Sequence, residues 1–328
     1  MKCSIFPFAN IKFCEGGMFM DKAMQKEFSA ALKKEFDYTA LMRSVRVLAE
    51  CYDFLGFSYL TESIMGRGIP LLTIGEGQKQ IFYIGAHHGA ERITAAVLIK
   101  FVAEFCAHAK RGTAVCGMNL SYIMKTCTIY VVPMLNPDGV EISANGVPAD
   151  SLWHSRLVKM NGSHNFTHWQ ANARGVDLNH NYDADFEEYK KLEPTLGIRG
   201  GCASKYSGEA PESEPETGAL CNYLRFNKPS ALMTLHTQGR EIYYTNGGMY
   251  PSTSKAAAAK LAELTGYKLN IPTGTAAYGG LTDFCIQKLG VPAFTLECGK
   301  GKNPLPKSEL SLIYSDLRKA LFTFPTMF

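Results

Sequence analysis

A histidine and a glutamate three residues apart, His88 and Glu91, stand where an apolar strand beginning at Ile81 runs into a turn. Apolar residues recur at helical spacing over 92–108, so the pair lies between a strand end and a helix. Ligands of open α/β sheets bind outside strand ends, and this spacing lets both side chains turn toward one point. The pair is part of the His₂Glu set typical of catalytic zinc. The competing interpretation is an exposed histidine and a first-turn glutamate that the helix dipole favours.

Two further candidates end other apolar strands. His236 ends ALMTLH, and Glu297 ends VPAFTLE. One ligand distant from a neighbouring pair is a common way to build a zinc site, so we predict His236 as the third ligand. Glu297 is a candidate general base, because zinc lowers the pKa of water to about 7 and a nearby carboxylate can take the proton. Taken alone, both residues also fit ordinary strand-end positions.

Two loop residues suggest further roles in hydrolysis. Arg174 lies in ANARGVDLN, and a fixed guanidinium can stabilise the oxyanion formed when water attacks a carbonyl. Tyr278 lies in AAYGG, where flexible neighbours would let it swing over a bound substrate. Each residue alone fits an exposed loop position equally well.

The elements that must position these residues alternate between strands and helices, which predicts one α/β domain with a largely parallel or mixed sheet between helices. The segment 143–178 is long, polar and aromatic, and we expect an ordered functional loop there. A turn is predicted over 136–139, and Ser213 is a candidate helix cap. Helices are predicted over 38–57, 92–108, 212–226, 254–264, 281–289 and 310–322, a hairpin over 58–74, and strands from 81 and over 127–134, 231–236, 242–244 and 291–297.

The composition bounds the class of protein. The chain has 328 residues, 46% hydrophobic and 20% charged, enough for a sizeable core. A net charge of +4 without a Lys/Arg run argues against a nucleic-acid or membrane partner, and no stretch approaches the ~20 apolar residues of a span. Ten cysteines, none in a CxxC pair, favour a reducing, cytoplasmic location over a disulfide-bonded secreted one. We expect an N-terminal extension over 1–36 and a single catalytic domain over 37–328; the oligomeric state stays open.

Eight segments, in order, resemble the zinc carboxypeptidase family: GRGIPLLTIG, GAHHGAE, VVPMLNPDG, NARGVDLNHNYD, SGEAPESEPET, LHTQG, AAYGGLTDF and FTLECG. They cover the chain from about residue 38 to its end. The resemblance implies a mixed, mainly parallel eight-stranded sheet sandwiched between helices, and one Zn²⁺ per chain. It also implies metal ligands His88, Glu91 and His236, general base Glu297, carbonyl polariser Arg174, a closing Tyr278, and Asn179 as a ligand of the substrate carboxylate.

One position departs from the family pattern. Members that trim free C-termini have an arginine after the asparagine matched by Asn179, and here it is His180. A histidine cannot make the same planar, bidentate grip on a carboxylate. The chain is instead similar to the bacterial branch that cuts cell-wall peptides between γ-D-glutamate and meso-diaminopimelate. We expect His180 and Arg240 to suit such a zwitterionic residue, although Arg240 also fits a surface position.

These features predict a zinc metallopeptidase acting on peptide or muropeptide amide bonds of peptidoglycan. Three alternatives remain open at this point. The first is an ordinary metallocarboxypeptidase that removes C-terminal residues, and the second is a zinc-dependent N-acyl amino acid acylase. The third is a protein that binds a cell-wall peptide without cutting it.

Overall fold

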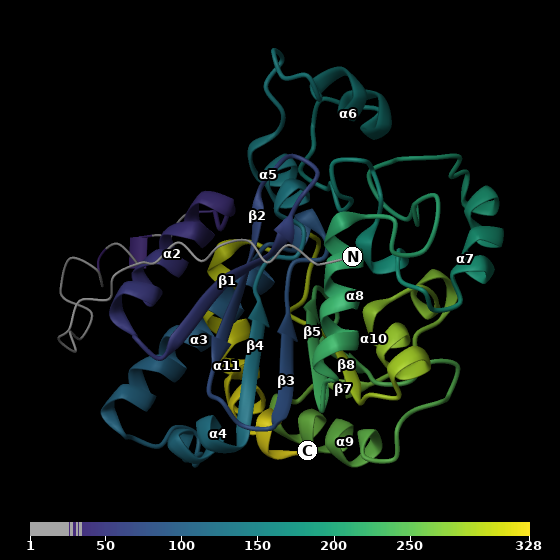
Figure 1. Cartoon of the computed structure of the whole chain (residues 1–328). Coiled ribbons are helices and arrows are strands. Elements are labelled where there is room, and N and C mark those ends of the chain that lie inside the picture. The colour runs from purple at the N-terminus through teal and green to yellow at the C-terminus, as the bar shows by residue number, and fades with distance from the viewer. Residues whose placement is uncertain (1–25, 27–28, 31, 33–34) are drawn as a thin grey trace, which may run out of the picture.

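The computed structural model describes residues 26, 29–30, 32 and 35–328, and most of the predicted extension over 1–36 lies outside them. In this part of the chain eight strands form a mixed sheet in the order β1-β2-β4-β3-β5-β8-β6-β7 (Figure 1). The predicted fold class is confirmed. The strands are β1 (Leu55–Glu62), β2 (Gly68–Ile74), β3 (Lys79–Ile84), β4 (Cys127–Val132), β5 (Ala231–His236), β6 (Glu241–Tyr243), β7 (Lys268–Leu269) and β8 (Ala293–Glu297).

The centre of the sheet is parallel and its margins are mixed. β3 pairs in parallel with β4 and β5, and β5 pairs in parallel with β8. β1 and β2 form an antiparallel hairpin beside β4, and β6 runs antiparallel to β8. The carboxyl ends of β3, β5 and β8 therefore meet at one edge, where α/β proteins place their ligands.

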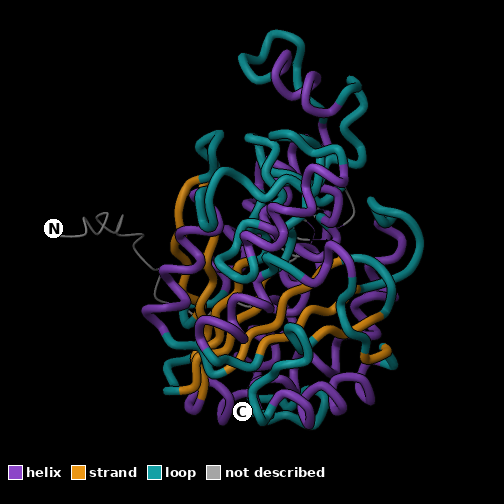
Figure 2. The backbone as a smooth tube through the Cα atoms, turned by 90° about the vertical axis from the view of Figure 1, so that its right-hand side faces the viewer, coloured by secondary structure: helices purple, strands orange, loops and turns teal. Residues whose placement is uncertain are grey.

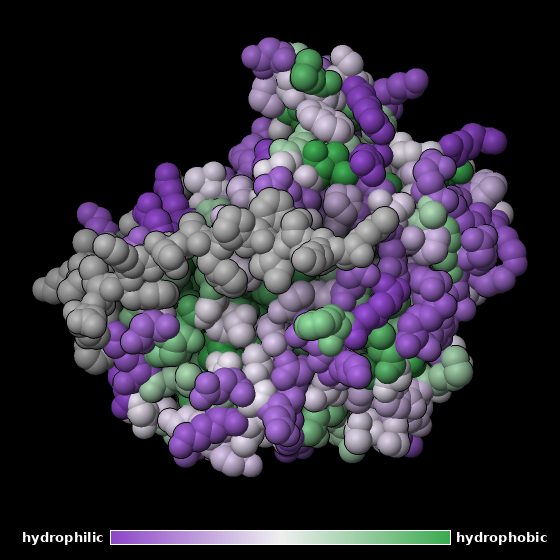
Figure 3. Space-filling view, viewed as in Figure 1, coloured by the Kyte–Doolittle hydropathy of each residue, from purple (hydrophilic) through white to green (hydrophobic). Residues whose placement is uncertain are grey.

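Helices cover both sides of the sheet, so the strands form a layer between them (Figure 2). The helices are α2 (Tyr38–Cys51), α3 (Ile93–Arg111), α4 (Leu120–Thr126), α5 (Pro137–Asn145), α6 (His154–Asn161), α7 (Phe186–Leu192), α8 (Pro215–Asn227), α9 (Ser254–Thr265), α10 (Leu281–Phe284) and α11 (Leu310–Thr323). None of the helices in the described ranges combines the length and the apolar character needed to cross a bilayer. Hydrophilic side chains predominate over α7, on the right of Figure 3.

Strand side chains alternate between two apolar cores, one on each face of the sheet. The α3 face packs against α2, α3, α9 and α11 and carries Ile81, Tyr83, Met233, Leu235, Ile242, Phe294 and Leu296. The α8 face packs against α8 and α10 and carries Phe82, Ile84, Leu232 and Ala293.

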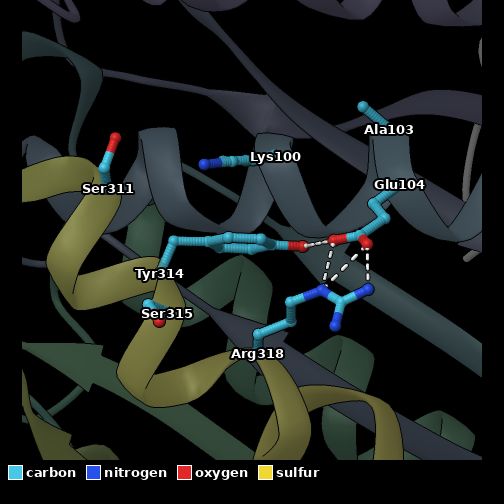
Figure 4. A pocket seen from close by; sticks show the side chains of 7 residues that line it. All are labelled: Lys100, Ala103, Glu104, Ser311, Tyr314, Ser315 and Arg318. Atoms are coloured by element: carbon cyan, nitrogen blue, oxygen red, sulfur yellow. Dashed lines mark hydrogen bonds and ion pairs between the residues drawn. The ribbon is translucent and has the colours of Figure 1, made fainter. Parts of the chain in front are cut away.

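Helix α3 follows the strand-to-helix turn after β3 and packs against α11. It ends at Arg111 and is followed by Gly112, whose φ of 65° is the left-handed conformation that favours glycine after a helix end. A polar cluster joins α3 to α11: Glu104 accepts hydrogen bonds from the hydroxyl of Tyr314 at 2.6 Å and from the guanidinium of Arg318 (Figure 4). These contacts compensate the charge of Glu104 within the shallow depression between the helices.

Several predicted boundaries are wrong. The helix expected over 38–57 ends at Cys51, because Leu55 pairs with Ile74 in the antiparallel ladder of β1 and β2. The hairpin is confirmed but begins earlier than predicted. The turn expected over 136–139 is a helix start, in which the side chain of Asn136 accepts a hydrogen bond from the backbone of Gly139 at 2.8 Å.

Three further differences concern the later part of the chain. The long segment 143–178 contains α6, and the helix expected over 281–289 divides into α10 and a π-helical turn, Cys285–Leu289. Ser213 is not the cap of α8, because that helix begins with Pro215 and Glu214 occupies the cap position. The two-residue edge strand β7 was missed.

Candidate metal centre

The three predicted metal ligands lie together at the carboxyl edge of the sheet. His88 follows β3, Glu91 lies in the 3₁₀ turn that precedes α3, and His236 is the last residue of β5. One ligand atom from each lies within 4.8 Å of the others. The two carboxylate oxygens of Glu91 lie 2.9 Å from Nδ1 of His88 and 3.2 Å from Nδ1 of His236. Two segments 145 residues apart therefore converge on one point.

A second layer of hydrogen bonds fixes these side chains. Nε2 of His88 lies 3.0 Å from Oδ1 of Asp177, which leaves Nδ1 facing Glu91. Asn303 donates from Nδ2 to Glu91 at 3.2 Å, and the backbone of Thr237 donates to the other carboxylate oxygen at 3.1 Å. A carboxylate on the second nitrogen of a histidine is the usual arrangement around a protein-bound metal. Neither Asp177 nor Asn303 was predicted from the sequence, although Asp177 stands in the segment ARGVDLN.

Burial and mutual charge perturb the acid–base properties of the cluster. Burial by itself lowers the pKa of His88, but the carboxylates of Glu91 and Asp177 outweigh it and raise that pKa well above its usual value. Burial opposes ionisation of Glu91, yet His88 and His236 bring the pKa of its carboxyl down to about 2. The site therefore holds its carboxylates ionised in a buried setting, as a cation site must.

The donor set fits zinc. Two imidazoles and one carboxylate are its usual ligands at a catalytic site. In addition, Nε2 of His236 is buried and has no hydrogen-bond partner among the described residues. The neighbouring His87 makes other contacts. Its Nε2 lies 2.8 Å from the hydroxyl of Tyr182, and its ring stacks on that of His236 with centroids 5.0 Å apart. Burial lowers the pKa of His87 well below its usual value, so His87 supports His236 as a neutral ring.

Glu297 lies beside the cluster. It ends β8 and stands next to His236 in the parallel ladder of β5 and β8. Burial, followed by the charge of Glu91, raises the pKa of the Glu297 carboxyl well above its usual value. A buried carboxylate with a raised proton affinity, next to a metal site, has the properties of a general base.

Arg174 is placed at a distance from these contacts. Its side chain is 47% exposed, and Nη1 lies 3.7 Å from Oε2 of the buried Glu214. Its backbone N–H donates to the side chain of Asn172 at 2.9 Å. The structure gives Arg174 no bond to the three predicted ligands, and its role in polarising a carbonyl stays a prediction.

His180 and Tyr278 are joined to each other. The ring of His180 is buried and stacks on Tyr189 with centroids 4.0 Å apart. Its Nδ1–H donates to the backbone carbonyl of Tyr278 at 2.9 Å, and burial lowers the pKa of the imidazole. Asn179, one residue earlier, accepts a hydrogen bond from the backbone of Leu281 at 3.2 Å. These bonds tie the 178–180 turn to the loop of Tyr278, and the substrate contacts of all three site residues stay predictions.

Arg240 is engaged by other partners. Its guanidinium lies 3.3 Å from Asp316 on α11 and 5.3 Å from the ring centre of Tyr267. Its backbone N–H donates to the carbonyl of Glu297 at 2.7 Å. The side chain therefore packs toward α11, and its predicted contact with substrate stays a prediction.

Comparison with known proteins identifies relatives of this chain by sequence and by fold. The γ-D-glutamyl-L-diamino acid endopeptidase 1 of Lysinibacillus sphaericus is 33% identical over 87% of this chain and 70% of its own length. Thrombin activatable fibrinolysis inhibitor has a TM-score of 0.68 at 17% identity over 93% of this chain and 78% of that one. The murein-tripeptide amidase MpaA of Escherichia coli O157 has a TM-score of 0.52 at 20% identity, over 81% and 91% of the two chains. Both solved structures share the fold.

The model of the zinc carboxypeptidase family matches residues 44–320. That range contains all three predicted metal ligands and Glu297. Members of this family are hydrolases that use a catalytic zinc ion, so the predicted cofactor is confirmed. On the length of this match and the 33% identity to the endopeptidase, the chain belongs to the zinc carboxypeptidase family.

Proposed function

We propose that this zinc metallopeptidase hydrolyses the amide bond between a γ-D-glutamyl residue and a diamino acid, meso-diaminopimelate, in cell-wall peptides. The observation that carries the proposal is the state of His180. A buried imidazole, stacked on Tyr189 and bonded to the backbone of Tyr278, stands where carboxypeptidases of the family present a guanidinium fork. The name of the relative from Lysinibacillus sphaericus, which specifies γ-D-glutamyl and diamino acid residues, supports the same substrate class.

In the proposed mechanism His88, Glu91 and His236 hold the ion. Zinc held there would supply Lewis-acid chemistry, activating a water molecule and polarising the scissile carbonyl. Glu297 takes the proton of the attacking water, and the same carboxyl returns it to the leaving amine.

The remaining predicted residues act on the substrate. Arg174 donates hydrogen bonds to the carbonyl oxygen as negative charge develops, and its exposed guanidinium must turn from Glu214 to do so. Asn179, His180 and Arg240 complete the predicted substrate site, and Tyr278 closes over it from the loop that His180 holds.

We further propose that residues 37–328 form a single catalytic domain that works in the cytoplasm. Six cysteines support a reducing environment, because they are buried within the two apolar cores as small hydrophobic side chains. They are Cys51, Cys106, Cys127, Cys221, Cys285 and Cys298.

The test compares three substrates by mass analysis of their products. They are L-Ala-γ-D-Glu-meso-diaminopimelate, a plain peptide with a free C-terminus, and an N-acyl amino acid, each with and without a chelator. We expect chelator-sensitive release of diaminopimelate and slow cleavage of the other two. Efficient trimming of the plain peptide alone would establish an ordinary carboxypeptidase, and release of the acyl group alone would establish an acylase. Binding of the muropeptide without cleavage would overturn the enzymatic assignment.

A further inference from the structure

The register of the sheet places a second carboxylate beside Glu297. β6 and β8 are antiparallel, and Glu241 is the direct partner of Glu297 across that pair. His236 is the partner of Glu297 on its other side, in the parallel pair of β5 and β8. One metal ligand, the proposed general base and Glu241 therefore form a row across three neighbouring strands.

All three side chains point to the same side of the sheet. Leu235, Leu296 and Ile242 belong to the core on the α3 face. Because side chains alternate along a strand, the residues next to them, His236, Glu297 and Glu241, lie on the α8 face. Directly opposed residues of an antiparallel pair have Cβ atoms about 5 Å apart. Glu241 is thus a close neighbour of the general base on the catalytic side of the sheet.

The carboxylate of Glu241 is held in place without a cationic partner. The hydroxyl of Tyr243, two residues along the same strand, donates to Oε2 of Glu241 at 2.5 Å. Burial, followed by Glu241, raises the pKa of Tyr243, so the hydroxyl stays a donor. Within the described residues, no lysine, arginine or histidine makes an ion pair with Glu241, which is partly exposed. A positioned, partly exposed carboxylate of this kind can bind a cation from solution.

The residues beyond Glu241 are also polar, although two of them, Thr282 and Thr295, are buried. Tyr243 is the ladder partner of Thr295, whose hydroxyl lies 2.7 Å from that of Thr282 at the start of α10. A leaving residue that passes Glu297 toward these hydroxyls would carry its side chain along Glu241. That path suits a side chain with a polar, charged end rather than an aliphatic one.

We propose that Glu241 is a specificity-determining residue that binds the second ammonium group of the leaving diamino acid. The inference rests on the proposed function, because it takes Glu297 as the base and the scissile amide as lying beside it. The ammonium forms a charge-assisted hydrogen bond with the carboxylate that Tyr243 orients. A leaving residue of the same shape without the ammonium loses this bond.

The test uses substrates that differ only in that ammonium. L-Lysine and L-norleucine share an unbranched four-carbon side chain, which only in lysine carries a terminal ammonium, so L-Ala-γ-D-Glu-L-Lys and L-Ala-γ-D-Glu-L-norleucine form a matched pair. A second pair has the same leaving residues on an ordinary α-linked peptide. The variants are Glu241→Gln and Tyr243→Phe, and the control is Glu50→Gln on the exposed face of α2. Each is assayed for kcat/KM and for zinc content.

We expect the wild type to cleave the lysine substrate about 10- to 100-fold faster than the norleucine substrate in kcat/KM. Glu241→Gln should bring this ratio close to one by losing activity on lysine alone, with full zinc content. Tyr243→Phe should lower the ratio in part, and Glu50→Gln should leave it unchanged.

An equal loss on both substrates in Glu241→Gln, or a wild-type ratio near one, would overturn the inference. Equal loss would mean that Glu241 acts only through Glu297. The proposed function fails separately, if the α-linked pair is cleaved and the γ-D-glutamyl pair is not. In that event the lysine-to-norleucine ratio of the α-linked pair decides the role of Glu241.

Discussion

Replacing Asp177 with asparagine should weaken zinc binding by changing which nitrogen of His88 carries a proton. Asp177 is buried, and both of its oxygens accept hydrogen bonds. Oδ1 lies 3.0 Å from Nε2 of His88, and Oδ2 accepts from the backbone N–H of Lys205 at 2.9 Å. Asparagine has one carbonyl oxygen, so it can satisfy only one of these two donors.

Each orientation of the new amide has a cost. With its oxygen toward His88, the amide nitrogen faces the N–H of Lys205, and an unpaired buried donor costs about 1–3 kcal/mol. With its oxygen toward Lys205, the amide donates to Nε2 of His88 and moves the ring proton to Nδ1, the nitrogen that faces Glu91. A protonated Nδ1 cannot bind a metal. Loss of such an outer partner typically lowers metal affinity about 10- to 100-fold, or about 1.4–2.7 kcal/mol.

The assay is the zinc dissociation constant of Asp177→Asn, measured by competition with a chromogenic chelator. The unfolding temperature is measured in parallel with and without zinc. Asp150→Asn is the matched control, because Asp150 is exposed. We expect the dissociation constant to rise about 10- to 100-fold in Asp177→Asn and to stay unchanged in the control. A change below about threefold would refute the role given to Asp177.

Three further predictions concern the base, the oxyanion and a buried acid. Glu297→Gln should keep its zinc and lose about 10²–10⁴ in kcat; loss of zinc, measured by metal analysis, would make Glu297 a ligand instead. Arg174→Ala should lower kcat about 10²–10³-fold with little change in KM, and near-normal turnover in steady-state kinetics would contradict its role. Burial raises the pKa of Glu216 from 4.5 to about 8 in the folded state. Between those pH values the carboxyl ionises in the unfolded state but not in the folded state, so the free energy of unfolding falls as the pH rises. Urea unfolding of Glu216→Gln and wild type at pH 5 and pH 8 tests this. The variant's gain in free energy of unfolding over wild type should be about 3 kcal/mol larger at pH 8 than at pH 5. An equal gain at both pH values would refute the raised pKa of Glu216 as its cause.

The convergence of the three predicted metal ligands was predictable because it follows from the strand ends. His88 and Glu91 lie in the turn that follows β3 and His236 ends β5, and parallel strands bring such ends to one edge. The fold was predictable for a similar reason, since the central strands are long apolar runs between helical segments. Boundaries that differ from expectation depend in part on pairing between distant segments, as when Leu55 of β1 pairs with Ile74.

The partners of the site residues were less predictable, because they come from loops whose paths depend on tertiary packing. Asn303 lies 212 residues from Glu91, to which it donates, and no local pattern marks it. The substitution at His180 was visible, but its stacking on Tyr189 was not. Glu241 stands next to Glu297 only through the antiparallel register of β6, a strand of three residues.

The zinc content of His236→Ala tests the proposed site most directly. Our interpretation predicts about one zinc per chain in the wild type and in Glu297→Gln, and a content near zero in His236→Ala with unchanged circular dichroism. A folded His236→Ala protein that still binds a full equivalent of zinc with wild-type affinity would contradict it.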